Sequence, residues 1–219
     1  IIKFPIKNYL DLCTICYKSQ LINKAVLLLY EFDVEKSLNK TISNFKITKD
    51  FDMWCSKKIR IDCMRVGEHD FNSVEISAKI SAKINEKYKV ETDFDHPNVI
   101  FFLYVYNNKA YFGVDFSGID LSKRQYKIFH HPESLKGTIG YYIVRQSGFS
   151  GKEVLIDPFM GSGMIIIEAG LYALNFPVQY YSKNNLAFVN YDFFKEHEKD
   201  FFENNDKNII KSKTNIYGY

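Results

Sequence analysis

Residues 154–170 read VLIDPFMGSGMIIIEAG, and this stretch decides the class of fold. Its first residues are apolar and lead into an Asp-Pro pair, which predicts the end of a short buried strand. Gly161 and Gly163 allow a tight turn, and the apolar run that follows predicts a buried helix from Gly163 to about Leu174. Strand, glycine turn and helix in this order are typical of the opening of a nucleotide-type α/β domain.

Three ligand classes can be compared with this turn. A phosphate-binding P-loop requires Gly-Lys-Ser/Thr, but Gly163 is followed by Met164 and Ile165. The dinucleotide fingerprint requires a third glycine where this chain has Ile166, so a nicotinamide-dependent oxidoreductase is the weakest hypothesis. Asp157 at the end of the strand, followed by free helix amides, instead favours a ligand with an amino-acid end, such as S-adenosylmethionine.

The composition is that of an ordinary folded protein. Of the 219 residues, 46% are hydrophobic and 25% are charged, which argues against a disordered chain. The longest apolar runs are of strand length, so no membrane helix is expected, and a net charge of +3 does not by itself indicate nucleic acid. Cys13 and Cys16 could be half a zinc site or a redox pair, but no second close pair or His pair completes a zinc site. Their spacing favours packing in the core of a reduced, cytoplasmic protein.

Both ends of the sequence suggest a fragment. It begins at Ile1 inside the run IIKFPI, which predicts a strand, and it stops at TNIYGY, which predicts a second buried strand. A parallel sheet that ended on its second strand would leave much apolar surface uncovered. We therefore expect the chain to be part of a longer protein and to be catalytically inactive by itself.

Helix and strand signals alternate along the first 120 residues. KNYLDLCTICYKSQL and VEKSLNKTISNF have helical spacing, and KAVLLLYEF between them is strand-like. KIRIDCM alternates apolar and polar residues, as expected of a strand with one buried face. Asn72 and Glu75 predict a capping box at the start of the next helix. Its buried stripe would consist of isoleucines four residues apart: Ile76, Ile80 and Ile84. NVIFFLYVY and AYFGVDF around the turn NNK predict a β-hairpin.

Residues 121–152 form a basic and aromatic segment. They contain six lysines and arginines but a single acid, with tyrosines and phenylalanine interleaved. Basic and aromatic side chains together suit a polyanion with stackable bases. A solvated connector whose tyrosines pack on a neighbouring domain would have the same composition, so both interpretations stay open.

The stretch VLIDPFMGSGMIIIEAG resembles motif I of the class I S-adenosylmethionine-dependent methyltransferases, in the branch that modifies RNA and carries a THUMP domain upstream. RVGEHDFNS and HPNVIFFLYVYNNKAYFGVDFSG resemble the THUMP domain, and DLSKRQYK resembles its exit. HPESLKGTIGYYIVRQSGF resembles the start of the catalytic domain. The resemblance covers essentially the whole chain and is strongest to THUMP guanine-N2 methyltransferases that act on tRNA or large-subunit rRNA.

This resemblance implies an α/β protein in four parts. Residues 1–50 would be a partial ferredoxin-like domain and residues 51–120 a THUMP domain, which together make an α+β N-terminal part. Residues 121–150 would be a basic linker that leads into the catalytic domain. Residues 151–219 would be the incomplete beginning of a Rossmann-like methyltransferase domain.

The resemblance also implies the residues of the site. The cofactor S-adenosylmethionine is expected to contact the glycine loop and a segment that folds back over it: His131, Pro132, Glu133, Ser134, Leu135, Asp157, Phe159, Met160, Gly161 and Gly163. RNA is expected to contact five basic residues: Arg65, Lys123, Arg124, Lys127 and Lys136. Met160 and Met164 replace the usual cysteine and threonine, which leaves the backbone loop possible, and Gln125 stands where glycine is common. The Asn/Asp-Pro-Pro-Tyr/Phe motif that positions the target amine is absent from the chain, so no catalytic residue is assigned.

These features predict an S-adenosylmethionine-dependent RNA methyltransferase with guanine N2 of tRNA as its target, or rRNA as the alternative substrate. The second hypothesis is an RNA-binding THUMP module without catalysis, a truncated or degenerate relative. Neither a metal nor a membrane is expected as a partner. His69 and Glu168 are interpreted as structural hydrogen-bonding residues rather than as catalysts.

Overall fold

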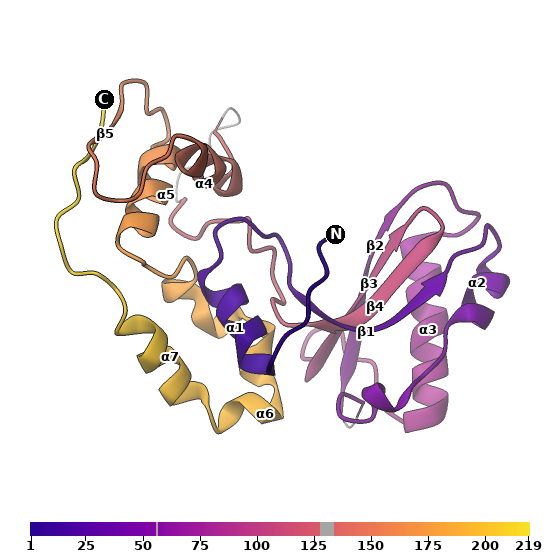
Figure 1. Ribbon diagram of the computed structural model, residues 1–219. Helices are drawn as coiled ribbons and strands as arrows, with labels where there is room; N and C mark the ends of the chain where they lie inside the picture. The colour runs from indigo at the N-terminus through magenta and orange to yellow at the C-terminus, as the bar shows by residue number, and fades with distance from the viewer. Residues whose placement is uncertain (56, 128–133) are drawn as a thin grey trace. The chain divides into compact units, whose positions relative to one another are not determined.

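The computed structural model describes residues 1–55, 57–127 and 134–219 (Figure 1). The chain divides into two compact units. One unit is continuous, residues 26–118, and the other combines residues 1–25 with residues 119–219. Within the described part of the chain, every helix is too short or too polar to cross a lipid bilayer.

The continuous unit is built on a four-stranded sheet. Its strands are β1 (Val26–Asp33), β2 (Ile59–Val66), β3 (Val99–Tyr106) and β4 (Lys109–Asp115). They lie in the order β1-β4-β3-β2, with β2 parallel to β3 and the other neighbours antiparallel. Its helices are α2 (Leu38–Asn44), η1 (Lys49–Phe51) and α3 (Ser73–Tyr88). The predicted strands and the predicted hairpin are therefore confirmed.

Helix α3 begins at the capping box that the sequence predicts. The Asn72 side chain accepts from the Glu75 N–H at 2.9 Å, and the Glu75 carboxylate accepts from the Asn72 N–H at 2.7 Å. Ile76, Ile80 and Ile84 are completely buried, and Figure 1 shows α3 lying along one face of the sheet. Both the cap and the buried stripe are confirmed, because each depends only on residues close together in the sequence.

Aromatic rings fill the core of the continuous unit. The ring of Phe112 lies 5.1 to 5.5 Å from those of Phe45, Phe51 and Phe101, measured between centroids. Phe101 and Phe112 come from β3 and β4, where alternate residues are buried. The alternation in the sequence therefore corresponds to one face of the sheet packed against helices and phenylalanine rings.

The discontinuous unit begins with α1 (Tyr9–Lys18) and continues after residue 118. Its central elements are α4 (Gly137–Gln146), β5 (Leu155–Asp157), α5 (Met164–Ala173) and β6 (Ile216–Gly218). A mostly helical stretch separates α5 from β6: η2 (Tyr180–Asn185), η3 (Ala187–Asn190), α6 (Asp192–Lys195) and α7 (Glu198–Asp206). Helix α4 lies inside the segment that the sequence analysis treats as a linker, so this element was missed.

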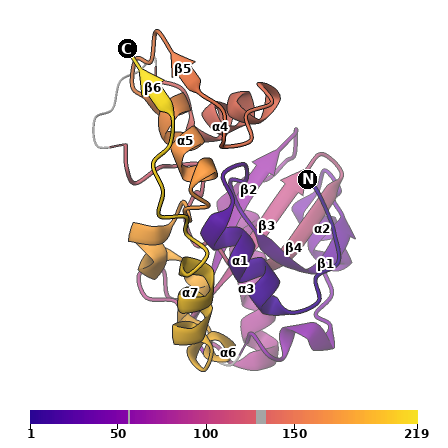
Figure 2. The ribbon, with the colours of Figure 1, turned by 60° about the vertical axis from the view of Figure 1, so that its left-hand side comes forward.

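Strands β5 and β6 pair in parallel, and α5 connects their ends into a β-α-β unit. Leu155 and Ile216 pack against a small buried cluster on one face. The cluster has three members: Val144, Phe149 and Ala169. Figure 2 shows the two strands side by side next to α5 and α4.

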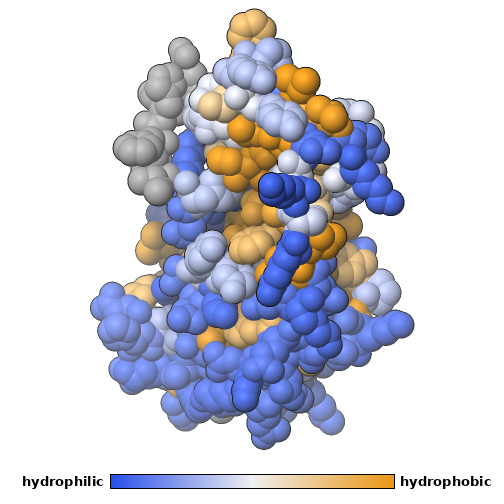
Figure 3. Space-filling model, turned by 90° about the vertical axis from the view of Figure 1, so that its left-hand side faces the viewer, coloured by the Kyte–Doolittle hydropathy of each residue, from blue (hydrophilic) through white to orange (hydrophobic). Residues whose placement is uncertain are grey.

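The opposite face of this strand pair is open. Ile156 and Tyr217 are 60% and 48% exposed. Figure 3 shows apolar residues gathered in the upper part of the surface, where Figure 2 places β5 and β6. The two predicted strands are confirmed, and their open face agrees with the expectation that much apolar surface would be uncovered here. The residues of the described chain cover only the face toward α4 and α5.

Helix α1 buries both of its cysteines. Cys13 and Cys16 have no exposed surface, and burial raises the pKa of the Cys13 thiol. Tyr17 in the same helix donates a hydrogen bond to Asp206 of α7 at 2.7 Å. The interpretation of the cysteine pair as core packing is confirmed. Among the described residues, no three His, Cys, Asp or Glu side chains group as a metal site would require.

The two units differ in extent from the predicted parts of the chain. Residues 26–50 lie with residues 51–118, because β1 pairs with β4 along its length. Residues 1–25 instead lie with residues 119–219. The apolar run at residues 1–6 forms no strand and is largely exposed, so that strand prediction is wrong. Local pattern does not identify the partner that a strand would pair with.

Candidate functional site

The turn between β5 and α5 leaves room for a ligand. Gly161 and Gly163 have φ angles of +51° and +72°, in the left-handed region that glycine adopts readily. A Cβ atom built on Gly161 would find no atom of the described residues within 4 Å, so this part of the chain leaves the space above it open. Gly163 is the N-cap of α5, and no side chain among the described residues caps this helix. The first turn of α5 therefore offers N–H groups to an anion.

Asp157 ends β5 and places a carboxylate beside this turn. Its Oδ1 accepts a hydrogen bond from the Phe159 N–H at 3.2 Å. The Tyr219 N–H donates to the Asp157 carbonyl at 3.0 Å, and the Met160 N–H donates to the Tyr219 carbonyl at 3.1 Å. The loop is thus fixed to the residue after β6, at the carboxyl edge of a parallel strand pair where α/β proteins bind ligands.

Gly218 in β6 also shapes this site, although it was not among the predicted site residues. A Cβ atom there would clash with Met160 Sδ and lie 2.8 Å from Cδ1 of Ile166. With glycine at this position, β6 passes close to Met160 of the loop and to Ile166 in the first turn of α5 without displacing either side chain. A glycine inside a strand-like run is the signal that could have indicated a close approach.

The segment before α4 reaches the same loop. Ser134 Oγ and Ser162 Oγ lie 2.7 Å apart, at hydrogen-bonding distance. Leu135 follows with 40% of its surface exposed. The other three residues expected to cover the cofactor lie outside the described residues: His131, Pro132 and Glu133.

The remaining loop residues present side chains to solvent. Phe159 is 92% exposed and Met160 is 37% exposed. The structure therefore brings most of the expected cofactor residues into one loop and its immediate neighbours. They are Ser134, Leu135, Asp157, Phe159, Met160, Gly161 and Gly163.

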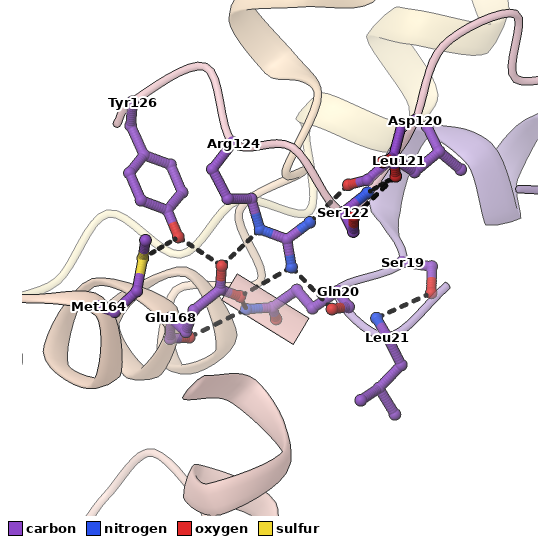
Figure 4. A network of polar contacts seen from close by, with 10 residues as sticks. All are labelled: Ser19, Gln20, Leu21, Asp120, Leu121, Ser122, Arg124, Tyr126, Met164 and Glu168. Atoms are coloured by element: carbon purple, nitrogen blue, oxygen red, sulfur yellow. Dashed lines mark hydrogen bonds and ion pairs between the residues drawn. The ribbon is translucent and has the colours of Figure 1, made fainter. Parts of the chain in front are cut away.

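A buried polar cluster, formed by Gln20, Arg124, Tyr126 and Glu168, lies against α5 (Figure 4). Arg124 Nε lies 2.5 Å from Glu168 Oε1, and the two side chains are 1% and 0% exposed. The Tyr126 hydroxyl donates to the same carboxylate oxygen, and Gln20 Nε2 donates to Glu168 Oε2 at 2.5 Å. Burial, followed by the negative charge of Glu168, raises the pKa of Tyr126.

The cluster corrects one expectation about RNA. Arg124 donates to the carbonyl oxygens of Leu121 and Gln20, at 2.6 and 2.7 Å, in addition to its ion pair. A guanidinium that is buried and bonded in this way is not available to a phosphate. The interpretation of Glu168 as a structural hydrogen-bonding residue is confirmed.

The other expected RNA residues are more accessible. Lys123 and Lys136 are exposed, and Lys127 is half-buried. Arg65 lies in β2 and is half-buried, with Nη1 donating to the Gly67 carbonyl at 3.0 Å. His69 contacts Arg65 and the Asn107 carbonyl, as expected of a loop hydrogen-bonding residue.

A protein-family model matches each of the two units. A THUMP domain model matches residues 34–115, and a model described as RMKL-like, methyltransferase domain matches residues 124–218. The chain joins a THUMP domain to an RMKL-like methyltransferase domain. The THUMP match lies within the continuous unit and the methyltransferase match within the discontinuous one. The predicted α/β fold and both of these domains are therefore confirmed, whereas a ferredoxin-like domain at residues 1–50 stays a prediction.

Individual relatives agree with this pair of domains. The tRNA (guanine(6)-N2)-methyltransferase of Methanocaldococcus jannaschii is 29% identical over 209 residues, covering 89% of this chain and 54% of that protein. The ribosomal RNA large subunit methyltransferase K/L of Psychromonas ingrahamii is 26% identical, covering 93% of this chain and 27% of that protein. The solved structure of SMU.472 complexed with SAH superposes with a TM-score of 0.72 at 16% identity, covering 96% and 58% of the two chains. The chain thus spans about half the length of the archaeal relative.

Proposed function

We propose that the protein transfers a methyl group from S-adenosylmethionine to RNA, with guanine N2 of tRNA as the acceptor. The observation that carries this proposal is the glycine turn after Asp157, with open space over Gly161 and an uncapped helix start at Gly163. The choice of RNA is supported by the THUMP domain and by relatives named as tRNA and rRNA methyltransferases.

The residues at this turn fit the amino-acid end of the cofactor. A carboxylate at Asp157 suits an ammonium group, directly or through water. The N–H groups in the first turn of α5 suit a carboxylate, because they add to the positive end of the helix dipole. Phe159, Met160 and the segment at Ser134 would lie against the rest of the cofactor.

The chemistry asks for positioning more than for acid or base catalysis. When bound, S-adenosylmethionine supplies a methyl group that its sulfonium already makes electrophilic. The loop residues would fix that group in place, and the acceptor amine would have to approach it in line. The target base must be unpaired or extruded, at a cost of a few kcal/mol. The THUMP domain would hold RNA through backbone and end contacts, and Lys123, Lys127 and Lys136 would add positive charge.

Asp157→Ala tests the cofactor assignment. Loss of a charge-assisted hydrogen bond to the ammonium group is expected to weaken S-adenosylmethionine binding by about 10- to 100-fold in calorimetry of the intact protein. Glu153→Ala is the matched control, because Glu153 is held by Ser150 two residues before β5 begins. Unchanged affinity in Asp157→Ala would refute the assignment.

Mass spectrometry of RNA nucleosides tests the acceptor. Cells that lack the gene are expected to lose N2-methylguanosine from tRNA and to keep it in rRNA. Loss of N2-methylguanosine from rRNA alone would identify ribosomal RNA, and not tRNA, as the substrate. Unchanged nucleosides, together with retained RNA binding by the purified protein, would favour the alternative of an RNA-binding module without catalysis.

A further inference from the structure

The buried cluster around Glu168 has no part in the cofactor contacts proposed above, yet it lies against the helix that carries them. Glu168 is in the middle of α5, and its carboxylate binds three side chains from two chain segments. Figure 4 shows Gln20, Arg124 and Tyr126 converging on it. Arg124 also donates to the carbonyls of Leu121 and Gln20, so the segment that leaves the THUMP domain in the chain is bound to α5.

The cluster reaches the cofactor loop through Tyr126. Its hydroxyl contacts Glu168 Oε1 and also lies 3.3 Å from Sδ of Met164. Met164 is the first residue of α5 and directly follows Gly163. One hydroxyl group therefore connects the ion pair to the turn whose amides face the proposed ligand.

Helix α4 closes the cluster from another side. A Cβ atom on Gly137 would lie 2.6 Å from Glu168 Oε1 and would also clash with the Arg124 side chain. A Cβ atom on Gly140 would lie 3.3 Å from the Met164 carbonyl oxygen. The two glycines let the start of α4 pack directly on the cluster and on the first residue of α5.

We propose that Arg124, Tyr126 and Glu168 are positioning residues that hold the first turn of α5, and with it the glycine loop, in the form that binds the cofactor. The part of this inference that concerns the cofactor rests on the proposed function. Apolar side chains of similar volume could fill the same space and can be equally stabilising. Directional hydrogen bonds add a fixed orientation of α5 relative to the segments that surround it.

Tyr126→Phe tests the inference, with Tyr141→Phe as the matched control. The first variant removes the hydroxyl that contacts Met164 but keeps the ion pair, whereas the Tyr141 hydroxyl accepts a hydrogen bond from Arg145 within α4. In the ligand-free intact protein, amide hydrogen exchange at residues 160–166 is expected to become about threefold to tenfold faster in Tyr126→Phe only. Unchanged exchange there would overturn the proposal.

Cofactor affinity separates this inference from the proposed function. Tyr126→Phe is expected to bind S-adenosylmethionine about threefold to tenfold more weakly than the wild type, and Tyr141→Phe equally well. If the wild-type protein bound no S-adenosylmethionine, the proposed function would be refuted. Faster amide exchange in Tyr126→Phe would still support the positioning role of the cluster. Equal cofactor affinity in wild type and Tyr126→Phe would show that the cluster is structural only.

A double variant guards against simple misfolding. Arg124→Met combined with Glu168→Met removes both charges, so no unpaired charge is left buried. The Tm of this double variant is expected to stay near that of the wild type, while its affinity for S-adenosylmethionine is expected to be lower than that of the wild type. A double variant that equals the wild type in both Tm and affinity would overturn the proposal.

Discussion

Glu168 shows how much one buried carboxylate can depend on its partners. Its side chain has no exposed surface, and it pairs with an equally buried Arg124. Replacing one member of such a pair leaves an uncompensated charge in the interior, whereas a surface carboxylate that is replaced remains solvated. Replacing one member of this buried pair is therefore expected to reduce stability more than replacing a surface carboxylate.

Glu168→Gln is expected to lower the free energy of unfolding by about 3–5 kcal/mol, because Arg124 keeps its charge without a counter-ion. Urea denaturation followed by circular dichroism measures the change. Glu203→Gln is the control: this carboxylate is 67% exposed and lies 4.0 Å from Lys199, so its loss should change stability by less than about 0.5 kcal/mol. Equal effects of the two variants would contradict the burial argument.

Asp93 gives the THUMP domain a specific response to acid. A backbone hydrogen bond from the His96 N–H, together with Lys58, lowers its pKa to about 2. Since the folded-state pKa lies below the ordinary value of 3.8, the stabilisation is present above about pH 4 and is lost as the pH falls toward 2. Asp93→Asn should flatten the dependence of Tm on pH between 4 and 2. A variant with the same acid dependence as the wild type would contradict this.

At the scale of elements, α4 packs closely on α5 because Gly137 has no side chain. Gly137 lies against Arg124 and Glu168, whereas Gly170 of α5 has no atom within 4 Å of a built Cβ. The sequence does not distinguish these two glycines. Their different surroundings arise only when α4 and α5 cross.

Gly137→Ala and Gly170→Ala are therefore expected to act in opposite directions. The first should destabilise the domain by about 1–3 kcal/mol through overpacking. The second should stabilise it by up to about 1 kcal/mol, because alanine favours a helix interior. Thermal melts of both variants measure the difference, and destabilisation by Gly170→Ala would show a contact that the structure lacks.

The elements that the sequence predicted best are those with local signals. The capping box at Asn72, the isoleucine stripe of α3 and the hairpin of β3 and β4 depend on neighbours within a few residues. Helix α4 was missed because Gly137 and Gly140 weaken the helical pattern, and both are present for packing rather than for helix formation. Uncovered apolar surface beside β5 and β6 was expected, but apolar residues alone do not say which face is covered, and α4 on the covered side was not predicted.

At the scale of the whole molecule, the THUMP unit is one continuous segment whose first and last strands are paired with each other. Val26 at the start of β1 pairs with Asp115 at the end of β4. The methyltransferase unit instead needs two segments, because Gln20 and Tyr17 bind Glu168 and Asp206. The THUMP unit should therefore fold from a single segment, whereas the methyltransferase unit should need both of its segments.

Residues 26–118 are expected to fold alone, with native-like circular dichroism and a cooperative thermal transition. Residues 119–219 without residues 1–25 should lack this cooperativity, because Glu168 and the aromatic cluster around Tyr17 lose their partners. Adding residues 1–25 as a separate peptide should restore part of it. Cooperative unfolding of residues 119–219 alone would contradict the division of the chain.

The sequence by itself determined the strand, glycine turn and helix at residues 154–170 and the cap and stripe of α3. These depend on backbone freedom and side-chain periodicity, which are properties of short segments. The tertiary structure alone decided that Arg124 is buried, that residues 1–25 lie with the methyltransferase unit and that β6 passes close to Met160 and Ile166 at Gly218. Each of these depends on which distant segments meet, and short-range sequence pattern carries no information about that.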